Sequence, residues 1–360
     1  MVNKEFWQGK KVLITGHTGF KGAWLSLWLR LWNAEVSGFS LSPPTVPSLF
    51  ELANLKDVMC SIEGDIRDID LVKEVVTTQK PDIVIHLAAQ ALVRRSYFDP
   101  VETYSTNTMG TVNLLEAIRK IGGVRVVVII SSDKCYDNRD WVWGYREIDS
   151  MGGFDPYSSS KGASELITAA YRHSFFNPQT FDQHGVALAS ARAGNVIAGG
   201  DWAEDRLVPD IMKAFLEDQV LKIRNPDSWR PWQHVLEPLN GYLILAEKLY
   251  NHGVEFAEAW NFGPNNDALR KVSWVVEKIG EMWGQGGRWE LASGTQPHEA
   301  RFLSLDCSKA KMRLGWRPQL DLEQALRLTV DWYKGWQNDP ATVREITETQ
   351  IISYTKLQNG

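Results

Sequence analysis

A glycine-rich segment near the start of the chain is the feature that most constrains its fold. The apolar run Lys11–Thr15 is typical of a buried strand, and it leads directly into Gly16-His17-Thr18-Gly19-Phe20-Lys21-Gly22, after which a helical pattern begins near Ala23. Glycines at this spacing permit a tight turn and close approach of the backbone to a pyrophosphate, while the helix N-terminus supplies N–H donors. The context predicts a dinucleotide-binding βαβ unit, with a plain strand-to-helix turn as the alternative.

The first half of the chain alternates short β-branched runs with helical stretches, which is typical of a parallel sheet covered by helices. Further strands are expected at 34–39, 82–87, 124–130 and 185–190, and helices at 71–80 and 106–120. The sequence therefore predicts an α/β fold with a Rossmann-type doubly wound parallel sheet.

After about Arg192 the alternation gives way to loops rich in glycine, proline and tryptophan. We expect two domains: a dinucleotide-binding domain over 1–192 and a smaller mixed α/β domain over 193–360 that binds the substrate. Because the helix expected at 236–250 is apolar, the segment 233–262 is predicted to pack back onto the first domain.

Composition excludes several classes of function. A formal net charge of −5 over 360 residues provides no basic field for a nucleic-acid backbone. The N-terminus has no apolar leader, and no run approaches the roughly 20 apolar residues that span a bilayer, so we expect a cytoplasmic protein without a membrane partner. The three cysteines, at positions 60, 135 and 307, have neither the number nor the spacing of a disulfide framework or a zinc site, and no metal is expected.

The end of the second strand bears on the choice of cofactor. The acidic residue that usually holds the adenosine ribose is missing from Gly38-Phe39-Ser40-Leu41-Ser42, and no arginine stands there for a 2′-phosphate, so NAD is favoured over NADP. Asp65, followed by Ile66, is a candidate for the adenine edge or else a solvated turn. Leu87, Ala88 and Ala89 end a buried strand, and their small side chains would admit the dinucleotide.

A tyrosine and a lysine lie one helical turn apart, at Tyr157 and Lys161, and Ser132 ends a buried strand at the same edge. A tyrosine with an ordinary pKa of about 10 becomes a base near neutrality only if positive charge stabilises its phenolate. Lys161 and an oxidised nicotinamide would supply that charge. Ser132 would hydrogen-bond the same substrate hydroxyl. The alternative is an incidental Tyr–Lys pair on a packed helix.

Together, Thr15–Gly22, His86-Leu87-Ala88-Ala89-Gln90, Asn107, Ser131-Ser132 and Tyr-x-x-x-Lys resemble the extended short-chain dehydrogenase/reductases over nearly the whole chain. The resemblance implies that the cofactor contacts Gly16, Thr18, Gly19, Phe20, Gly22, Ser40, Asp65, Ile66, Leu87, Ala88, Ala89, Asn107, Tyr157 and Lys161. Within this group, Ser132-Asp133-Lys134-Cys135-Tyr136 and the Ser-Leu-Ser-Pro-Pro after the second strand resemble the sugar-nucleotide 4,6-dehydratases. The branch that they resemble acts on CDP-D-glucose.

That resemblance implies a dehydration with no net redox change. Tyr157 takes the proton of the sugar C4 hydroxyl, the C4 hydride passes to NAD, water leaves across C5–C6, and the hydride returns to C6. Asp133 is implied as the acid and Lys134 as the base, although a free Asp is ionised and a free Lys protonated at neutral pH. Adjacent groups would share one proton, or Lys134 would stay charged and stabilise the enolate. A surface turn is the alternative for both.

The resemblance also implies a sugar-nucleotide pocket. Asn195 and Arg230 are the main candidates there, because a guanidinium matches phosphate oxygens bidentately. Arg206, Arg301 and Arg94 are further candidates, and a surface or interdomain ion pair is the alternative for each. The 4-keto-6-deoxy product would feed bacterial surface-polysaccharide synthesis, including the lipopolysaccharide O-antigen.

Two rival functions share the fold. A nucleotide-sugar 4-epimerase would need Ser132, Tyr157 and Lys161 but no acid–base pair for C5 and C6, so Asp133-Lys134 argues against it. A non-catalytic NAD-sensing protein would not need the Tyr–Lys pair. The family resemblance predicts a homodimer or homotetramer, assembled through the apolar segments 101–117 and 163–171.

Overall fold

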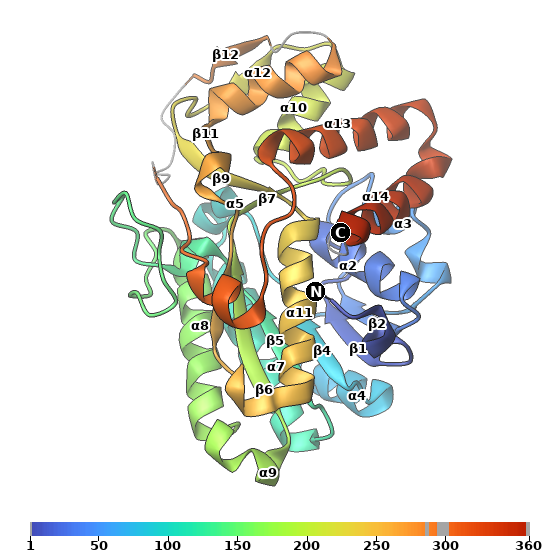
Figure 1. Ribbon diagram of the computed structural model, residues 1–360, viewed down its shortest axis with the longest axis vertical. Coiled ribbons are helices and arrows are strands. Elements are labelled where there is room, and N and C mark those ends of the chain that lie inside the picture. The colour runs from blue at the N-terminus through green and yellow to red at the C-terminus, as the bar shows by residue number, and fades with distance from the viewer. Residues whose placement is uncertain (1, 285–287, 294–301, 358–360) are drawn as a thin grey trace.

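The computed structural model describes residues 2–284, 288–293 and 302–357, and its centre is a seven-stranded parallel sheet (Figure 1). The strand order is β10-β6-β5-β4-β1-β2-β3, so the chain begins in the middle and winds outward in both directions. The strands are β1 Lys11–Thr15, β2 Glu35–Ser40, β3 Cys60–Glu63, β4 Ile83–His86, β5 Val126–Ile130, β6 Ala187–Ala193 and β10 Ala259–Phe262. This order confirms the predicted doubly wound α/β fold.

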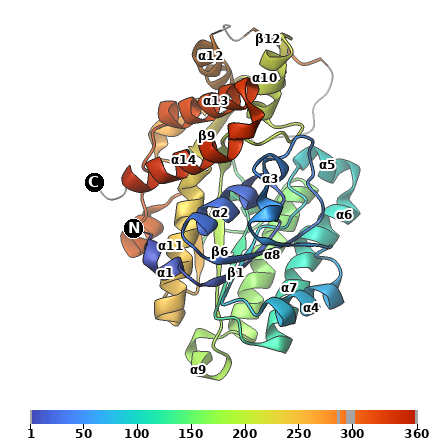
Figure 2. The same cartoon turned by 90° about the vertical axis from the view of Figure 1, so that its right-hand side faces the viewer.

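Helices cover both faces of the sheet (Figure 2). One face carries α4 (Ile69–Gln79), α7 (Gly110–Ile121) and α8 (Pro156–Ser174), and the other carries α2 (Phe20–Leu31) and α11 (Leu236–His252). The remaining helices are α1 Lys4–Trp7, α3 Leu49–Leu52, α5 Val93–Phe98, α6 Pro100–Tyr104, α9 Phe181–His184, α10 Leu207–Leu216, α12 Val272–Trp283, α13 Leu322–Asn338 and α14 Val343–Leu357. Short helical turns are η1 Leu55–Asp57, η2 Ser105–Met109, η3 Asp133–Cys135, η4 Pro178–Thr180, η5 Gly253–Glu255, η6 Asn266–Ala268, η7 Ala310–Leu314 and η8 Pro340–Thr342.

Two small sheets stand above the carboxyl edge of the large one (Figure 1). One joins β7 (Asn195–Ile197), β9 (Trp229–His234) and β11 (Leu269–Lys271), and the other pairs β8 (Leu221–Ile223) with β12 (Trp289–Leu291). They lie with α10, α12 and α13, beyond the point where the sequence loses its regular alternation. The domain boundaries themselves remain a prediction.

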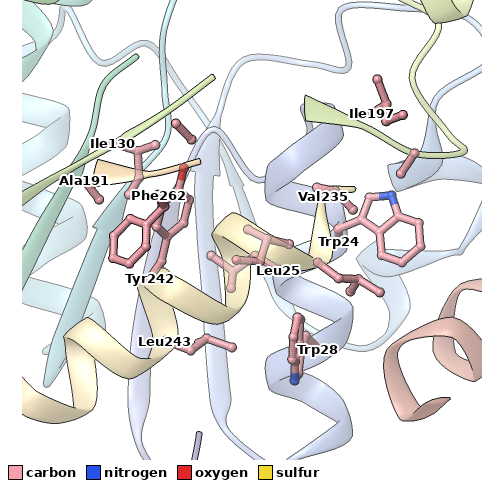
Figure 3. Close-up of a cluster of buried hydrophobic side chains, with 14 of the residues drawn as sticks. Trp24, Leu25, Trp28, Ile130, Ala191, Ile197, Val235, Tyr242, Leu243 and Phe262 are labelled. Carbon is pink, nitrogen blue, oxygen red and sulfur yellow. The ribbon is translucent and has the colours of Figure 1, made fainter. Parts of the chain in front are cut away.

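The largest hydrophobic core lies between α2, α11 and the sheet (Figure 3). Trp24 and Trp28 of α2 and Tyr242 and Leu243 of α11 are buried in it, and Phe262 of β10 packs with them. Although α11 and β10 come late in the chain, α11 packs on the sheet formed by the first half and β10 pairs with its strand β6. Within the described residues no helix is both long and apolar enough to cross a membrane.

Candidate functional site

A cavity of about 1360 Å³ opens along the carboxyl edge of the seven-stranded sheet. One arm of it follows the loop between β1 and α2 and the ends of β2 and β4. The other arm runs past the end of β5 and the start of α8 to the segment between β7 and β9. A parallel sheet collects its catalytic and binding groups at this edge, so a cofactor and a second ligand can meet where the arms join.

The glycine loop is packed too tightly for side chains at two positions. Gly16 has a φ of +77°, and a Cβ on it would lie 2.7 Å from the backbone nitrogen of Ala88. A Cβ on Gly22 would lie 2.2 Å from the Gly16 carbonyl oxygen. The loop therefore closes directly over the end of β4, and α2 starts at Phe20 with its free N–H groups facing the cavity, as a diphosphate requires.

Hydroxyl groups lie at the end of β2, the position at which many dinucleotide-binding sites have an acidic residue and this sequence has none. The hydroxyls of Thr18 and Ser40 are 2.8 Å apart, and Thr18 donates a second hydrogen bond to the carbonyl of Leu41 at 2.9 Å. Asp65 also borders the cavity, but its carboxylate is bound by Arg67 at 2.5 Å, and this hydrogen bond lowers the pKa of Asp65. The adenine edge would therefore meet an ion pair rather than a lone carboxylate.

Most of the other residues expected at the cofactor line the cavity, namely Gly16, Thr18, Gly19, Phe20, Gly22, Ser40, Ile66, Leu87, Ala88, Ala89, Tyr157 and Lys161. Asn107 is an exception. It is buried behind the cavity wall, where its amide exchanges two hydrogen bonds with the backbone of Gln90 and donates a third to Ser160 at 2.8 Å. Because these hydrogen bonds use its side-chain amide, Asn107 links the segment after β4 to α8 and does not line the cavity.

The start of α8 places the tyrosine and the lysine. Asp155 caps the helix by accepting a hydrogen bond from the backbone of Ser158 at 2.9 Å, and Pro156 occupies the first turn. Tyr157 and Lys161 follow, 8% and 6% exposed. Lys161 donates to the Ile130 carbonyl at 3.5 Å, at the end of β5. The cap thus fixes both side chains at the carboxyl edge.

Directly after β5, a short turn presents Ser132 and the candidate acid–base pair Asp133 and Lys134. Ser132 caps η3 by accepting a hydrogen bond from the Lys134 backbone at 3.2 Å, and its hydroxyl also bonds with Tyr157 and Asp133. The Asp133 side chain is 2% exposed, and its Oδ1 lies 3.9 Å from Nζ of Lys134. Its other oxygen, Oδ2, is buried and makes no hydrogen bond within the described residues. A surface turn does not fit the burial of Asp133, whereas the Lys134 side chain is 32% exposed.

Several titratable side chains lie close together where the two arms of the cavity join. Burial raises the pKa of Tyr157 to about 12 and lowers that of Lys161 to about 8. Lys21 points into the same region, where burial first, and then the charges of Arg206 and Lys161, lower its pKa to about 7. The site is therefore rich in cations that an anionic ligand would stabilise.

The second arm carries the candidates for the sugar nucleotide. Asn195, Arg206, Arg230 and Arg94 all border the cavity. Arg206 pairs with Asp201 at 2.8 Å, and Arg94 with Asp205 at 3.0 Å. Arg301 lies outside the described residues.

Among the charged cavity residues that the sequence analysis did not single out are Lys21, Asp201 and Arg224. Arg224, which directly follows β8, forms an ion pair with Asp205 at 2.9 Å. Asp201 orients Arg206. Lys21 lies within the glycine-rich segment, at a position where the dinucleotide-binding pattern requires no particular residue type. A charged residue at such a position could have marked Lys21 as a candidate for the site. For Asp201 and Arg224 the sequence holds no comparable signal.

The parallel sheet, the closed glycine loop and the Ser132–Tyr157–Lys161 group at its carboxyl edge define a member of the extended short-chain dehydrogenase/reductase class. Comparison with known proteins narrows this class. The chain belongs to the GDP-mannose 4,6 dehydratase family, whose model matches residues 13–329.

Individual relatives agree with that family. The chain is 57% identical over 336 residues to CDP-glucose 4,6-dehydratase of Salmonella typhimurium, covering 93% of this chain and 94% of the relative. A probable dTDP-glucose 4,6-dehydratase of Sinorhizobium fredii is 26% identical, covering 92% and 95%. Two solved structures share the fold: a dTDP-glucose 4,6-dehydratase from Bacillus anthracis in complex with NAD (TM-score 0.75, 23% identity, 92% and 98% covered), and a UDP-glucose 4-epimerase from Thermotoga maritima with UDP-glucose (TM-score 0.78, 24% identity, 91% and 99% covered).

Proposed function

We propose that the chain is an NAD-dependent hydro-lyase that converts CDP-D-glucose to CDP-4-keto-6-deoxy-D-glucose. The Salmonella relative, with more than half of its residues identical and both chains almost fully covered, supports this substrate. The observation that carries the reaction type is the buried, unpaired Oδ2 of Asp133 beside Ser132 and Lys134. An epimerase has no use for an acid at that point, whereas a dehydratase must protonate a leaving hydroxyl.

The first arm of the cavity fits NAD. The closed loop at Gly16 and Gly22 and the N-terminus of α2 would hold the diphosphate, and the hydroxyls of Thr18 and Ser40 would meet the adenosine ribose. The lack of a cation at the end of β2 supports NAD rather than NADP. Bound here, NAD⁺ would supply the hydride acceptor for C4 oxidation and the hydride source for C6.

Tyr157 removes the proton of the C4 hydroxyl. Since burial raises its pKa to about 12, its phenolate forms near neutrality only with positive charge beside it, and Lys161 supplies this charge from one turn further along α8. Ser132 shares a hydrogen bond with Tyr157, so it can hold the same hydroxyl and orient its proton.

Asp133 and Lys134 carry out the elimination. Once C4 is a ketone, the C5 proton is acidic, and Lys134 takes it while Asp133 donates a proton to the departing C6 hydroxyl. Their charged groups are 3.9 Å apart, which is an ion-pair contact but too long for a hydrogen bond, so sharing one proton requires the two side chains to move closer when the substrate binds. Lys134 as a fixed cation that stabilises the enolate is the alternative role.

The second arm would hold the CDP moiety. Arg206 is anchored by Asp201, so its guanidinium keeps a fixed direction toward the cavity, and Arg230 approaches from β9. Asn195, at the start of β7, would contact the sugar or its phosphates. Arg94 is held by Asp205 at the rim and is assigned to the phosphates. Arg301 remains a candidate from its position in the sequence alone.

Two further proposals concern the protein's setting. We assign the enzyme to the cytoplasm, where NAD and nucleotide sugars are available. We also assign it to a homodimer or homotetramer, because Phe98, Val101, Met109 and Leu166 are exposed apolar side chains on neighbouring helices; they are 92%, 76%, 50% and 61% exposed. Sedimentation at several protein concentrations tests the assembly.

The function is tested by incubating the purified protein and NAD⁺ separately with CDP-, dTDP-, UDP- and GDP-glucose. Formation of a 4-keto-6-deoxy sugar is followed by its absorbance in alkali. A product from CDP-glucose alone is expected. A sugar inverted at C4 without loss of water, or a product only with another base, would overturn the assignment.

A further inference from the structure

A buried ion pair lies directly behind the catalytic residues. Glu165 of α8 and Arg192 of β6 are 3% and 4% exposed, and Arg192 Nη2 is 2.8 Å from Glu165 Oε2. Neither residue lines the cavity, so neither touches a substrate. A buried pair of this kind is weak support for stability, because desolvation offsets much of its attraction. Its position therefore calls for another explanation.

The carboxylate of Glu165 holds the residue just before the catalytic serine. It accepts hydrogen bonds from the hydroxyls of Ser131 and Ser190, the second at 2.7 Å. Ser131 precedes Ser132, and Ser190 lies on the neighbouring strand β6. Glu165 therefore ties the end of β5 to α8 at the level of the active site.

The guanidinium of Arg192 holds the residue at the other end of the same segment. Its Nη1 donates to the hydroxyl of Tyr136 at 2.6 Å, and Tyr136 in turn donates to the amide oxygen of Asn261 at 2.8 Å. Tyr136 closes the η3 turn that carries Asp133 and Lys134. The ion pair thus binds both ends of the segment 132–135.

Glu165 also follows Lys161 by one helical turn. We propose that Glu165 and Arg192 are positioning residues for the reaction: together they hold Ser132, Asp133 and Lys134 in register with Tyr157 and Lys161, and Glu165 keeps Lys161 charged. This inference rests on the proposed function.

The charges around Lys161 support the second part. Burial lowers the pKa of Lys161 to about 8, and the carboxylate of Glu165 is the largest influence that opposes this. Although burial alone would raise it, Arg192 and the two serines hold the pKa of Glu165 below its ordinary value, so it is charged at neutral pH. The other titratable groups around Lys161 are Cys135 of η3, Lys21 of α2, His86 of β4 and Tyr157 of α8.

The test uses the full-length holoenzyme with E165Q, E165D and the double variant E165Q/R192Q. Removal of one partner leaves a buried charge unpaired and threatens folding, whereas removal of both takes away the two opposite charges together and so also leaves the net charge around the nearby Arg172 unchanged. The double variant is therefore the main reagent. Its folding is checked by thermal unfolding, and kcat and KM for CDP-glucose are measured across pH.

We expect the folded double variant to keep KM within about threefold and to lose about 10- to 100-fold in kcat, since small displacements of catalytic groups have effects of this size. Its kcat should also fall off at a lower alkaline pH, because Lys161 loses its proton sooner. E165D keeps the charge and should retain the wild-type alkaline limb. A folded double variant with wild-type kcat and an unchanged alkaline limb, or a kcat loss equal at all pH values, would overturn the inference. Inactive wild-type protein would instead refute the proposed function.

Discussion

Replacement of Asp133 by asparagine should separate the two halves of the proposed reaction. Asn has nearly the volume of Asp, and its amide oxygen can still accept the hydrogen bond that Ser132 donates at 2.9 Å. What D133N removes is the proton that Oδ2 would deliver into the cavity. C4 oxidation by Tyr157 should therefore persist, while the loss of water from C5–C6 should stall.

The size of the effect follows from the surroundings of Asp133. Its Oδ2 has no hydrogen-bond partner within the described residues, so no neighbour is placed to take over as acid. Lys134 lies 3.9 Å from the opposite oxygen. Loss of general-acid catalysis typically costs about 10²- to 10⁴-fold, or roughly 3–5 kcal/mol in the barrier, and we expect kcat for dehydration to fall in that range.

The assay follows two signals in one reaction mixture. D133N should accumulate reduced cofactor, seen by its near-ultraviolet absorbance, in an amount approaching one equivalent, while alkali-detectable product forms slowly. In deuterated water the C5 proton should still exchange, because Lys134 is intact. The exposed carboxylate variant D70N serves as the control and should match the wild type. Rapid dehydration by folded D133N, or no reduced cofactor at all, would refute the assignment of Asp133 as the acid.

Four other variants probe different parts of the molecule. Y157F should abolish C4 oxidation, so that, unlike D133N, it forms no reduced cofactor and loses at least about 10²-fold in kcat; rapid-mixing absorbance checks this. G22A would place a Cβ 2.2 Å from the Gly16 carbonyl oxygen, so the loop must open, and NAD titration by intrinsic fluorescence should show at least about tenfold weaker binding. Glu237 accepts hydrogen bonds from two backbone N–H groups and from Tyr354 at 2.7 Å, so E237A should lower the free energy of unfolding by about 3 kcal/mol or more in denaturant titrations. Burial raises the pKa of Glu237 to about 7, so only the folded chain binds this proton between about pH 5 and pH 7; stability falls as pH rises through this window, and in E237Q melting curves this slope should be smaller.

Local signals explain why much of the fold could be predicted. The strand expected at Lys11–Thr15 has those bounds in the structure, because its apolar run ends abruptly at the glycine loop. The strand expected at 185–190 instead runs over Ala187–Ala193. Its last residues, Ala191, Arg192 and Ala193, pair with β10, and a single sequence gives no sign of that distant partner.

Two strands of the seven-stranded sheet escaped prediction for different reasons. The edge strand β3, Cys60–Glu63, is partly exposed and has no apolar run, so its pairing with β2 supplies what the sequence pattern lacks. β10, Ala259–Phe262, is buried but four residues long, and its neighbour in the sheet lies about 70 residues earlier. In both cases the hydrogen bonds to a neighbouring strand, and not the local sequence propensity, determine that the segment is a strand.

In the candidate site, too, features that depend on local sequence could be predicted, whereas features that depend on distant contacts could not. The spacing of Tyr157 and Lys161 is a local property of one helix, so their shared position could be inferred. The roles of Asn107 and Asp65 depend on which donors and acceptors lie nearest after folding: Gln90 and Ser160 use the amide of Asn107, and Arg67 binds the carboxylate of Asp65. Every buried polar group must find a partner, and the partner sets its role. For the same reason Asp133 stands out. Among the side-chain oxygens of the proposed catalytic residues Ser132, Asp133 and Tyr157, only its Oδ2 is buried without a partner in the described residues, which would leave it available to a substrate.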